Sequence, residues 1–344
     1  MEKKKISFSD CTRHLYIPNL NTISKMGIYG MRTWLIKSNN YIVTNSNENY
    51  VDICFYDIKE PLSAWASDIS RLSCAFLESI ANVKESSVNR KFTAWNIVQY
   101  YYSAFYSAHC ILKILGFGLV QLDSTIISEF NKRANVVGIT LSNKITKGIY
   151  CVKFDNRNNK IVFYKIARYD DSHKGLWKRF IEFLNVLTGE YIVTNTYGND
   201  CIRLKNPEEE FPLSFFGKIP SNDALDAQDR IEQLKAILNL HGDANWLSSI
   251  RNMVNYSHGL GSWFPYINLS DNYDKVAAFQ KLCFNNFLNE SLNLKYDDVL
   301  MKFVISCQLI NALNYDILDD LKKRSPTSKS FLDEDFFKYF FLFS

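Results

Sequence analysis

The chain has 344 residues, 47% of them hydrophobic and 15% aromatic, and a formal net charge of +4. This length and composition predict two or three ordered domains with a substantial core, and they exclude a disordered or linker-type protein. No run of 18 apolar residues occurs, and no apolar segment follows the basic N-terminus. We therefore expect no membrane span, no secretion signal and a cytoplasmic location.

The cysteines and the known enzyme motifs exclude several kinds of site. The eight cysteines stand singly with no CxxC pair, which favours a reduced compartment and argues against a zinc site. The sequence contains no GxxxxGK[ST] loop, no GxGxxG after a strand, no HExxH and no GxSxG. We expect neither a metal nor a cofactor.

The first two predicted units are a β-rich N-terminal region, residues 1–59, and the first half of a helical bundle, residues 60–125. The N-terminal region contains three short apolar runs: Ile28 to Ile36, Tyr41 to Thr44 and Val51 to Tyr56. Apolar residues three or four positions apart predict a helix over Pro61–Val83 and an aromatic-rich helix over Ala94–Gly116, paired as an αα-hairpin. In the second helix, His109 is interpreted as a core residue that finds a hydrogen bond.

Residues 126–215 are predicted to be a basic, β-rich α/β insertion between the two halves of the bundle. Helices are predicted over Thr125–Lys132 and Lys174–Leu187. The predicted strands are Val136–Leu141, Gly148–Phe154, Lys160–Ala167, Tyr191–Thr196 and Asp200–Leu204. The polar break Asp155–Asn159 is predicted to be a hairpin turn.

The positive charge of the chain is concentrated in this insertion. Residues 131–180 contain 12 lysines and arginines against three aspartates. The candidate RNA-binding residues are Lys144, Lys147, Lys153, Arg157, Lys160 and Lys165. Interleaved aromatic residues (Tyr150, Phe154, Phe163, Tyr164 and Tyr169) would suit unstacked bases. Alternatively, the charges lie on solvated hairpin faces and the aromatic rings turn inward.

Residues 216–325 are predicted to be the second half of the bundle, followed by an aromatic tail, residues 326–344. The predicted helices run from the Ser221–Asp223 cap to Gly242, then over Trp246–Gly261, Lys275–Asn289 and Tyr296–Leu321. The six aromatic residues between Phe336 and Phe343 must be covered by the core or by a partner. The predicted fold is therefore mainly α, in the α+β class.

The stretch WLSSIRNMVNYSHGLG, Trp246–Gly261, contains the candidate catalytic residues. A rotation of 100° per residue places Arg251, His258, Asn255 and Ser248 on one polar stripe, beside an apolar face with Ile250, Met253 and Val254. An arginine suits phosphate oxygens and a histidine moves protons near neutral pH. Alternatively, Arg251 pairs with an acid and His258 favours a helix end.

Together with AWNIVQYYYSAFYSAHCILKILG, Ala94–Gly116, this stretch resembles the HEPN family. The family combines an aromatic-rich helix with an R-x4–6-H motif, which Arg251, Asn252 and His258 match with six residues between Arg251 and His258. The resemblance implies a bundle of about four or five helices and a metal-independent ribonuclease that acts as a homodimer, in a toxin or antiviral-defence role.

In the implied mechanism, His258 transfers the proton of a ribose 2′-OH that attacks the adjacent phosphate, which leaves a 2′,3′-cyclic phosphate. Arg251 stabilises the developing charge, and Asn252 and Asn255 orient the pair. The expected partners are RNA, with tRNA as one candidate, a second copy of the chain, and an antitoxin or activating protein; no membrane is expected. The alternative is a catalytically silent module that binds nucleic acid or protein within a larger complex.

Overall fold

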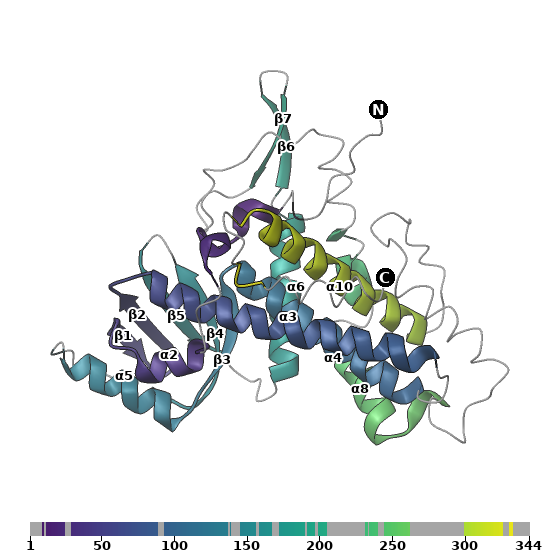
Figure 1. The fold of residues 1–344 in the computed structure, drawn as a ribbon, viewed down its shortest axis with the longest axis horizontal. Helices are drawn as coiled ribbons and strands as arrows, with labels where there is room; N and C mark the ends of the chain where they lie inside the picture. Colours follow the sequence, from purple (N-terminus) through teal and green to yellow (C-terminus); the bar gives the residue numbers. More distant parts are fainter. Residues whose placement is uncertain are drawn as a thin grey trace.

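The computed structural model describes residues 9, 12–24, 29–88, 93–136, 138, 145–155, 158–166, 172–189, 191–196, 199–204, 231–232, 234–239, 244–261, 299–325 and 330–332. Within these ranges the chain is mainly helical and contains a five-stranded and a two-stranded antiparallel sheet, which confirms the α+β class. Figure 1 shows the larger sheet at one end, with two long helices leading away from it.

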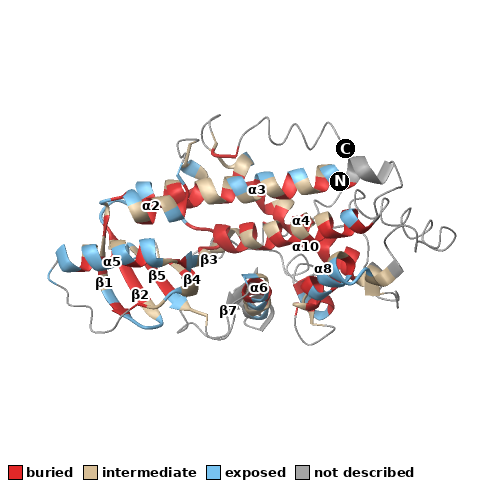
Figure 2. Ribbon diagram, turned by 90° about the horizontal axis from the view of Figure 1, so that it is seen from below, coloured by how far each residue is buried: buried red, intermediate tan, exposed pale blue. Residues whose placement is uncertain are grey.

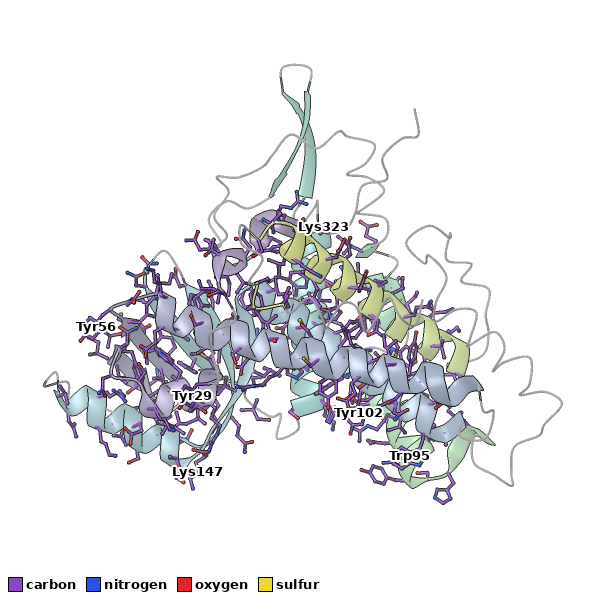
Figure 3. All side chains as sticks on the ribbon, viewed as in Figure 1. Tyr29, Tyr56, Trp95, Tyr102, Lys147 and Lys323 are labelled. Carbon is purple, nitrogen blue, oxygen red and sulfur yellow. The ribbon has the colours of Figure 1, made fainter. Side chains whose placement is uncertain are left out.

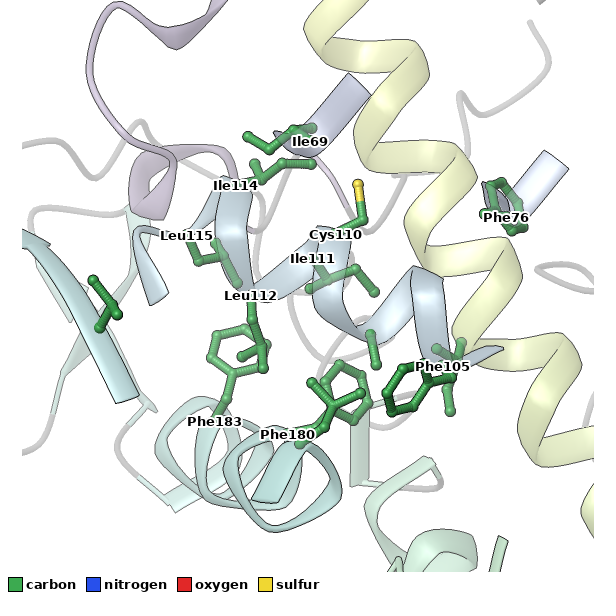
Figure 4. Packing of buried hydrophobic residues seen from close by; sticks show 14 of the residues in the cluster. Ile69, Phe76, Phe105, Cys110, Ile111, Leu112, Ile114, Leu115, Phe180 and Phe183 are labelled. Atoms are coloured by element: carbon green, nitrogen blue, oxygen red, sulfur yellow. The ribbon is translucent and has the colours of Figure 1, made fainter. Parts of the chain in front are cut away.

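Those two helices are α3 (Lys59–Val88) and α4 (Thr93–Ile114), and they confirm the predicted αα-hairpin. Their contact is close, since Ser73 Oγ lies 3.3 Å from Cys110 Sγ. Figure 4 shows α4 residues packed between Ile69 of α3 and aromatic residues of another helix. Helix α4 is buried on most of its surface, and it is the centre of the core in Figure 2. Trp95 of α4 is 49% exposed because it stands in the first turn, at the end of the helix.

Helix α10 (Val299–Lys323) lies along α4 and confirms the helix predicted over Tyr296–Leu321. Buried polar groups join the two: Asn311 Nδ2 donates to Ser103 Oγ at 2.8 Å, and Ser107 Oγ donates to Asn311 Oδ1 at 2.9 Å. Helix α8 (Trp246–Tyr256) also packs on α4. Helices α3, α4, α8 and α10 thus surround one core.

The five-stranded sheet combines strands from three regions that the sequence suggested were separate. Its order is β1 (Tyr41–Asn47), β2 (Tyr50–Phe55), β5 (Lys160–Lys165), β4 (Gly148–Asp155) and β3 (Phe117–Leu122). The N-terminal strand β2 therefore pairs directly with β5 of the predicted insertion. This pairing satisfies the backbone groups of β2, which would otherwise form an open edge. The turn predicted at Asp155–Asn159 is confirmed, since Asp155 pairs with Lys160.

Helices α2 (Met31–Lys37) and α5 (Ser124–Val136) cover one face of this sheet (Figure 1). The Tyr41 ring lies 5.0 Å from Trp34 of α2 and 6.2 Å from Phe130 of α5. The strand predicted over Ile28–Ile36 is wrong, because Met31, Trp34 and Leu35 are buried at helical spacing.

Two further predictions near this sheet differ from the structure. Val136, predicted to begin a strand, is the last residue of α5 and is 83% exposed. Strand β3 was not predicted, because it directly follows α4 and merges with the apolar pattern of that helix.

Helix α6 (Ser172–Gly189) confirms the helix predicted over Lys174–Leu187 and lies between the sheet and α4. Its residues Phe180 and Phe183 face α4 in Figure 4. The strands that follow, β6 (Tyr191–Thr196) and β7 (Asn199–Leu204), form the predicted antiparallel pair.

The N-terminal segment, with the short 3-10 helices η1 (Arg13–Leu15) and η2 (Leu20–Thr22), is attached to α10. Arg13 donates to both carboxylate oxygens of Asp320, and a β-bridge joins Ser24 to Ser330. The predicted helix over Lys275–Asn289 and the aromatic residues Phe336–Phe343 lie outside the described residues. No helix within the described ranges has the length and apolar character needed to cross a membrane.

Candidate functional site

The candidate site is centred on Arg251, in the middle of α8. The buried face of α8 contains Leu247, Ile250 and Val254. It also contains Ser248 and Arg251, which are only 4% and 7% exposed and contact Tyr101 of α4. The predicted polar stripe therefore faces the core at these two residues, because Ser248 and Arg251 are one turn apart. Met253, predicted to be on the apolar face, is 39% exposed.

The guanidinium of Arg251 lies over aromatic rings of α4. Its Cζ is 5.1 Å from the ring centre of Tyr101 and 5.6 Å from that of Tyr102. Both distances are within the range of cation–π attraction. Arg251 Nε is buried and has no hydrogen-bond partner, and no carboxylate among the described residues pairs with this cation. The alternative prediction, in which Arg251 forms an ion pair with an acidic residue, is thus not observed among the described residues.

The Tyr101 hydroxyl connects Arg251 to a histidine. Its oxygen lies 2.8 Å from Ser248 Oγ, 2.8 Å from His173 Nδ1, and 3.1 Å from Trp177 Nε1, which donates to it. Burial raises the pKa of Tyr101 to about 12, although the hydrogen bonds with Ser248 and Trp177 and the charge of Arg251 act to lower it. The hydroxyl therefore keeps its proton at neutral pH and serves as a hydrogen-bonding centre.

His258 lies outside the helix that was predicted to present it. Helix α8 ends at Tyr256, and the N–H of Ser257 donates to the Met253 carbonyl as a C-cap. His258 then has a φ of 49° and is exposed, so the projection of 100° per residue does not apply to it. The Arg251 side chain instead lies over the ring of Tyr101, whose hydroxyl contacts Ser248.

The two asparagines of the predicted site also lie apart from the Tyr101 hydroxyl. Asn252 is exposed and Asn255 is partly buried, whereas the hydroxyl forms its hydrogen bonds with Ser248, His173 and Trp177. The structure thus brings Arg251 to Tyr101, whose hydroxyl contacts His173, and the sequence singled out neither of these two residues.

The predicted RNA-binding lysines are divided between the two faces of the sheet. The register places Lys153 and Lys160 on one face and Lys165 on the other. Lys160 forms an ion pair with Asp52 at 3.0 Å, and Lys165 donates to Thr146 at 2.8 Å. Lys144 and Arg157 lie outside the described residues.

Lys147 is exposed at the rim of a cavity of about 310 Å³. The cavity is also lined by Gln121, Gly148, Ile149 and Ser172. The labelled Lys147 in Figure 3 extends from the sheet toward solvent. Among the predicted RNA-binding residues that the structure describes, Lys147 is therefore the one that is exposed to solvent.

Most of the aromatic residues of this region turn inward, as the alternative interpretation expected. Tyr150, Phe154 and Phe163 are buried on the face that packs against α2, α3 and α5. Tyr164 is 40% exposed and its ring contacts that of Tyr50 at 5.2 Å. Tyr169 lies outside the described residues.

His109, the one histidine of α4, is packed against Phe105, with ring centres 4.7 Å apart. Burial, together with the nearby Lys113 and His173, lowers the pKa of His109 to about 3. The ring is therefore neutral at physiological pH, as suits the core role predicted for it.

Neither the described side chains nor sequence comparisons identify a metal site or a family. Within the described ranges, no group of three or more His, Cys, Asp or Glu side chains is arranged to hold a metal ion. Comparisons with protein-family models, with curated proteins and with solved structures found no match. The buried Arg251 and its aromatic surroundings are therefore the feature from which a function can be inferred.

Proposed function

We propose that the chain is a metal-independent endoribonuclease in which Arg251 binds the scissile phosphate. The observation that carries this proposal is the burial of Arg251, at 7% exposure, with no carboxylate partner among the described residues. A buried cation without an anion is costly, so the free energy of binding a phosphate there is favourable. The planar guanidinium also matches two phosphate oxygens at once.

The packing of α8 on α4 supports the HEPN resemblance. The aromatic-rich stretch and the Arg251 stretch are the two parts of the chain on which the resemblance rests, and they contact each other through Tyr101 and Tyr102. In the proposed bundle, α3, α4, α8 and α10 supply the helices and α4 supplies the aromatic floor under the cation.

In the proposed reaction, the ribose 2′-oxygen attacks the adjacent phosphorus while His258 removes the hydroxyl proton. Arg251 stabilises the extra negative charge on the phosphorane, and Asn252 and Asn255 contact the ribose or phosphate. The products are a 2′,3′-cyclic phosphate and a 5′-hydroxyl. The leaving 5′-oxygen also needs an acid, which a second Arg251/His258 pair would supply in a homodimer.

The second candidate is a catalytically silent module that binds a protein or nucleic acid. Its support is the exposure of large apolar side chains on α8, because Met253 is 39% exposed and Tyr256, one turn later, is 72% exposed. Such neighbours on a surface are typical of a contact area. Arg251 would then only hold α8 on the aromatic rings of α4.

Cleavage of end-labelled tRNA and mRNA by the purified full chain in EDTA distinguishes the two candidates. We expect cleavage without added metal and products that end in a 2′,3′-cyclic phosphate. Arg251→Lys, which keeps the charge but loses the fork, should reduce the rate by about 10²-fold or more. The matched control is Arg32→Ala, which removes an exposed arginine paired with Asp123. Folded wild-type protein that leaves RNA intact would favour the silent module.

A further inference from the structure

A second group able to transfer a proton, His173 of the same chain, packs on the two tyrosine rings that Arg251 contacts. His173 is the second residue of α6, and its ring centre is 4.3 Å from Phe105, 5.7 Å from Tyr101 and 6.1 Å from Tyr102. Arg251 lies over the same two tyrosine rings, at 5.1 and 5.6 Å. The imidazole and the guanidinium therefore share one aromatic floor on α4, which Figure 3 marks at Tyr102.

The hydrogen bonds of Tyr101 fix which nitrogen of His173 meets the tyrosine. Trp177 Nε1 can only donate, so it occupies an acceptor position of the Tyr101 oxygen. The contact of 2.8 Å between that oxygen and His173 Nδ1 engages Nδ1. When His173 is an imidazolium, Nδ1–H donates to the tyrosine, and the second ring proton is on Nε2.

We propose that His173 is the general acid that protonates the leaving 5′-oxygen, an inference that rests on the ribonuclease function proposed above. In the balanced step, the 2′-oxygen forms a bond to phosphorus and its proton goes to His258. The phosphorus–O5′ bond breaks, its electron pair remains on O5′, and O5′ takes the Nε2 proton of the His173 imidazolium. A phosphate bound to Arg251 favours that imidazolium through its negative charge.

Tyr101 is a positioning residue in this assignment. Its hydroxyl holds Nδ1, and its neighbours Ser248 and Trp177 hold the hydroxyl, so the Nε2 side of the ring is oriented by the protein. One chain then supplies the acid that a composite site would otherwise take from a second copy.

A change of leaving group tests this role directly. The cleavage site is first mapped on ordinary RNA, and the same RNA is then made with sulfur in place of the bridging 5′-oxygen. A thiolate leaves without a proton, so it needs no general acid. His173→Gln keeps an amide that can bond to Tyr101 but cannot supply an acidic proton.

We expect His173→Gln to slow cleavage of the oxygen substrate by about 10²–10⁴-fold and that of the sulfur substrate by less than about 10-fold. Arg251→Lys and His258→Ala should slow both substrates, because charge stabilisation and the base are needed in either case. His109→Gln is the matched control, since His109 also packs on Phe105 but has no contact with the Tyr101 hydroxyl in the hydrogen bonds given above.

Three results would overturn the assignment. Cleavage of the oxygen substrate at the wild-type rate by His173→Gln would remove the acid role. Equal losses on both substrates, with an unchanged melting temperature, would mean a role other than protonation of O5′. Recovery of activity on mixing His173→Gln with His258→Ala chains would place the two histidines in different chains. If folded wild-type protein cleaves neither substrate, the ribonuclease function itself fails and this assignment fails with it.

Discussion

Replacing Asn311 with alanine tests whether the polar contact between α4 and α10 stabilises the bundle. Asn311 is 5% exposed, and its amide bonds to two hydroxyls of α4 that are fully buried, Ser103 and Ser107. The truncation removes both bonds and leaves space for three side-chain atoms. Ser103 still donates to the Tyr100 carbonyl, at 2.7 Å, but the proton of Ser107 loses its acceptor.

The lost hydrogen bonds and the space left by the amide set the expected loss in the free energy of unfolding. Each lost hydrogen bond costs about 1 kcal/mol, a buried hydroxyl left without its acceptor costs about 1 kcal/mol more, and the space left by the amide adds to this. We expect Asn311→Ala to lower the free energy of unfolding by about 3 kcal/mol. Ser103→Ala should cost about 1–2 kcal/mol, and the double variant should cost about 1 kcal/mol less than the sum, since the two share a bond.

Urea unfolding followed by circular dichroism and tryptophan fluorescence measures these differences. The matched control is Asn131→Ala, which removes an exposed asparagine from α5 and should change the free energy of unfolding by less than about 0.5 kcal/mol. If Asn311→Ala unfolds at the same urea concentration as Asn131→Ala, the polar contact between α4 and α10 does not stabilise the fold, and the reasoning is refuted.

Three further predictions concern charged groups. The pKa of His109 is lowered to about 3 in the folded chain, so between about pH 6.5 and 3 only the unfolded chain binds a proton at this imidazole. The free energy of unfolding should therefore fall as the pH falls through that window. His109→Phe should flatten this dependence in unfolding measured at pH 4 and 7, and an unchanged slope would contradict it. Asp320→Ala removes the buried acceptor of Arg13 and should lower the free energy of unfolding in urea by about 1–3 kcal/mol. Asp319→Ala, at its half-buried neighbour, should lower it by less than about 0.5 kcal/mol, and equal costs would refute the buried pair. Lys147→Glu should weaken RNA binding in a filter assay and lower its salt slope by about 1, and an unchanged slope would exclude a phosphate contact.

Periodicity predicted the long helices of this fold well, because a buried stripe repeated over several turns has one interpretation. The helix predicted over Pro61–Val83 is α3, Lys59–Val88, and the one predicted over Ala94–Gly116 is α4, Thr93–Ile114. The run Ile28–Ile36 was assigned to the wrong class, since a short apolar run fits both a strand and a single helical face. The pairing of β2 with β5 was not predictable either, because a sheet partner distant in sequence leaves no local pattern.

The sequence predicted the candidate site correctly only for residues that lie together on one helix. The spacing in α8 placed Ser248 and Arg251 together, and the structure agrees. The same spacing failed at His258, because the helix ends before it and a positive φ turns the chain away. Tyr101 and His173 are 72 positions apart, and His173 looked isolated because only packing brings α6 against α4.

The hydroxyl of Tyr101 shows how the predicted insertion becomes part of the site. On α8, Ser248 and Arg251 are three positions apart, and on α6, His173 and Trp177 are four positions apart, so each pair presents one helix face. Both faces meet at the same hydroxyl, and Trp177, which is fully buried, donates to it. A helix that merely covered α4 would need apolar side chains there and no matched donor. Helix α6 instead supplies an indole N–H and an imidazole that both contact one buried oxygen. A chain without α6 would keep Arg251 but would lose these two contacts of the Tyr101 hydroxyl. The segment that contains α6 is therefore an integral part of the candidate site.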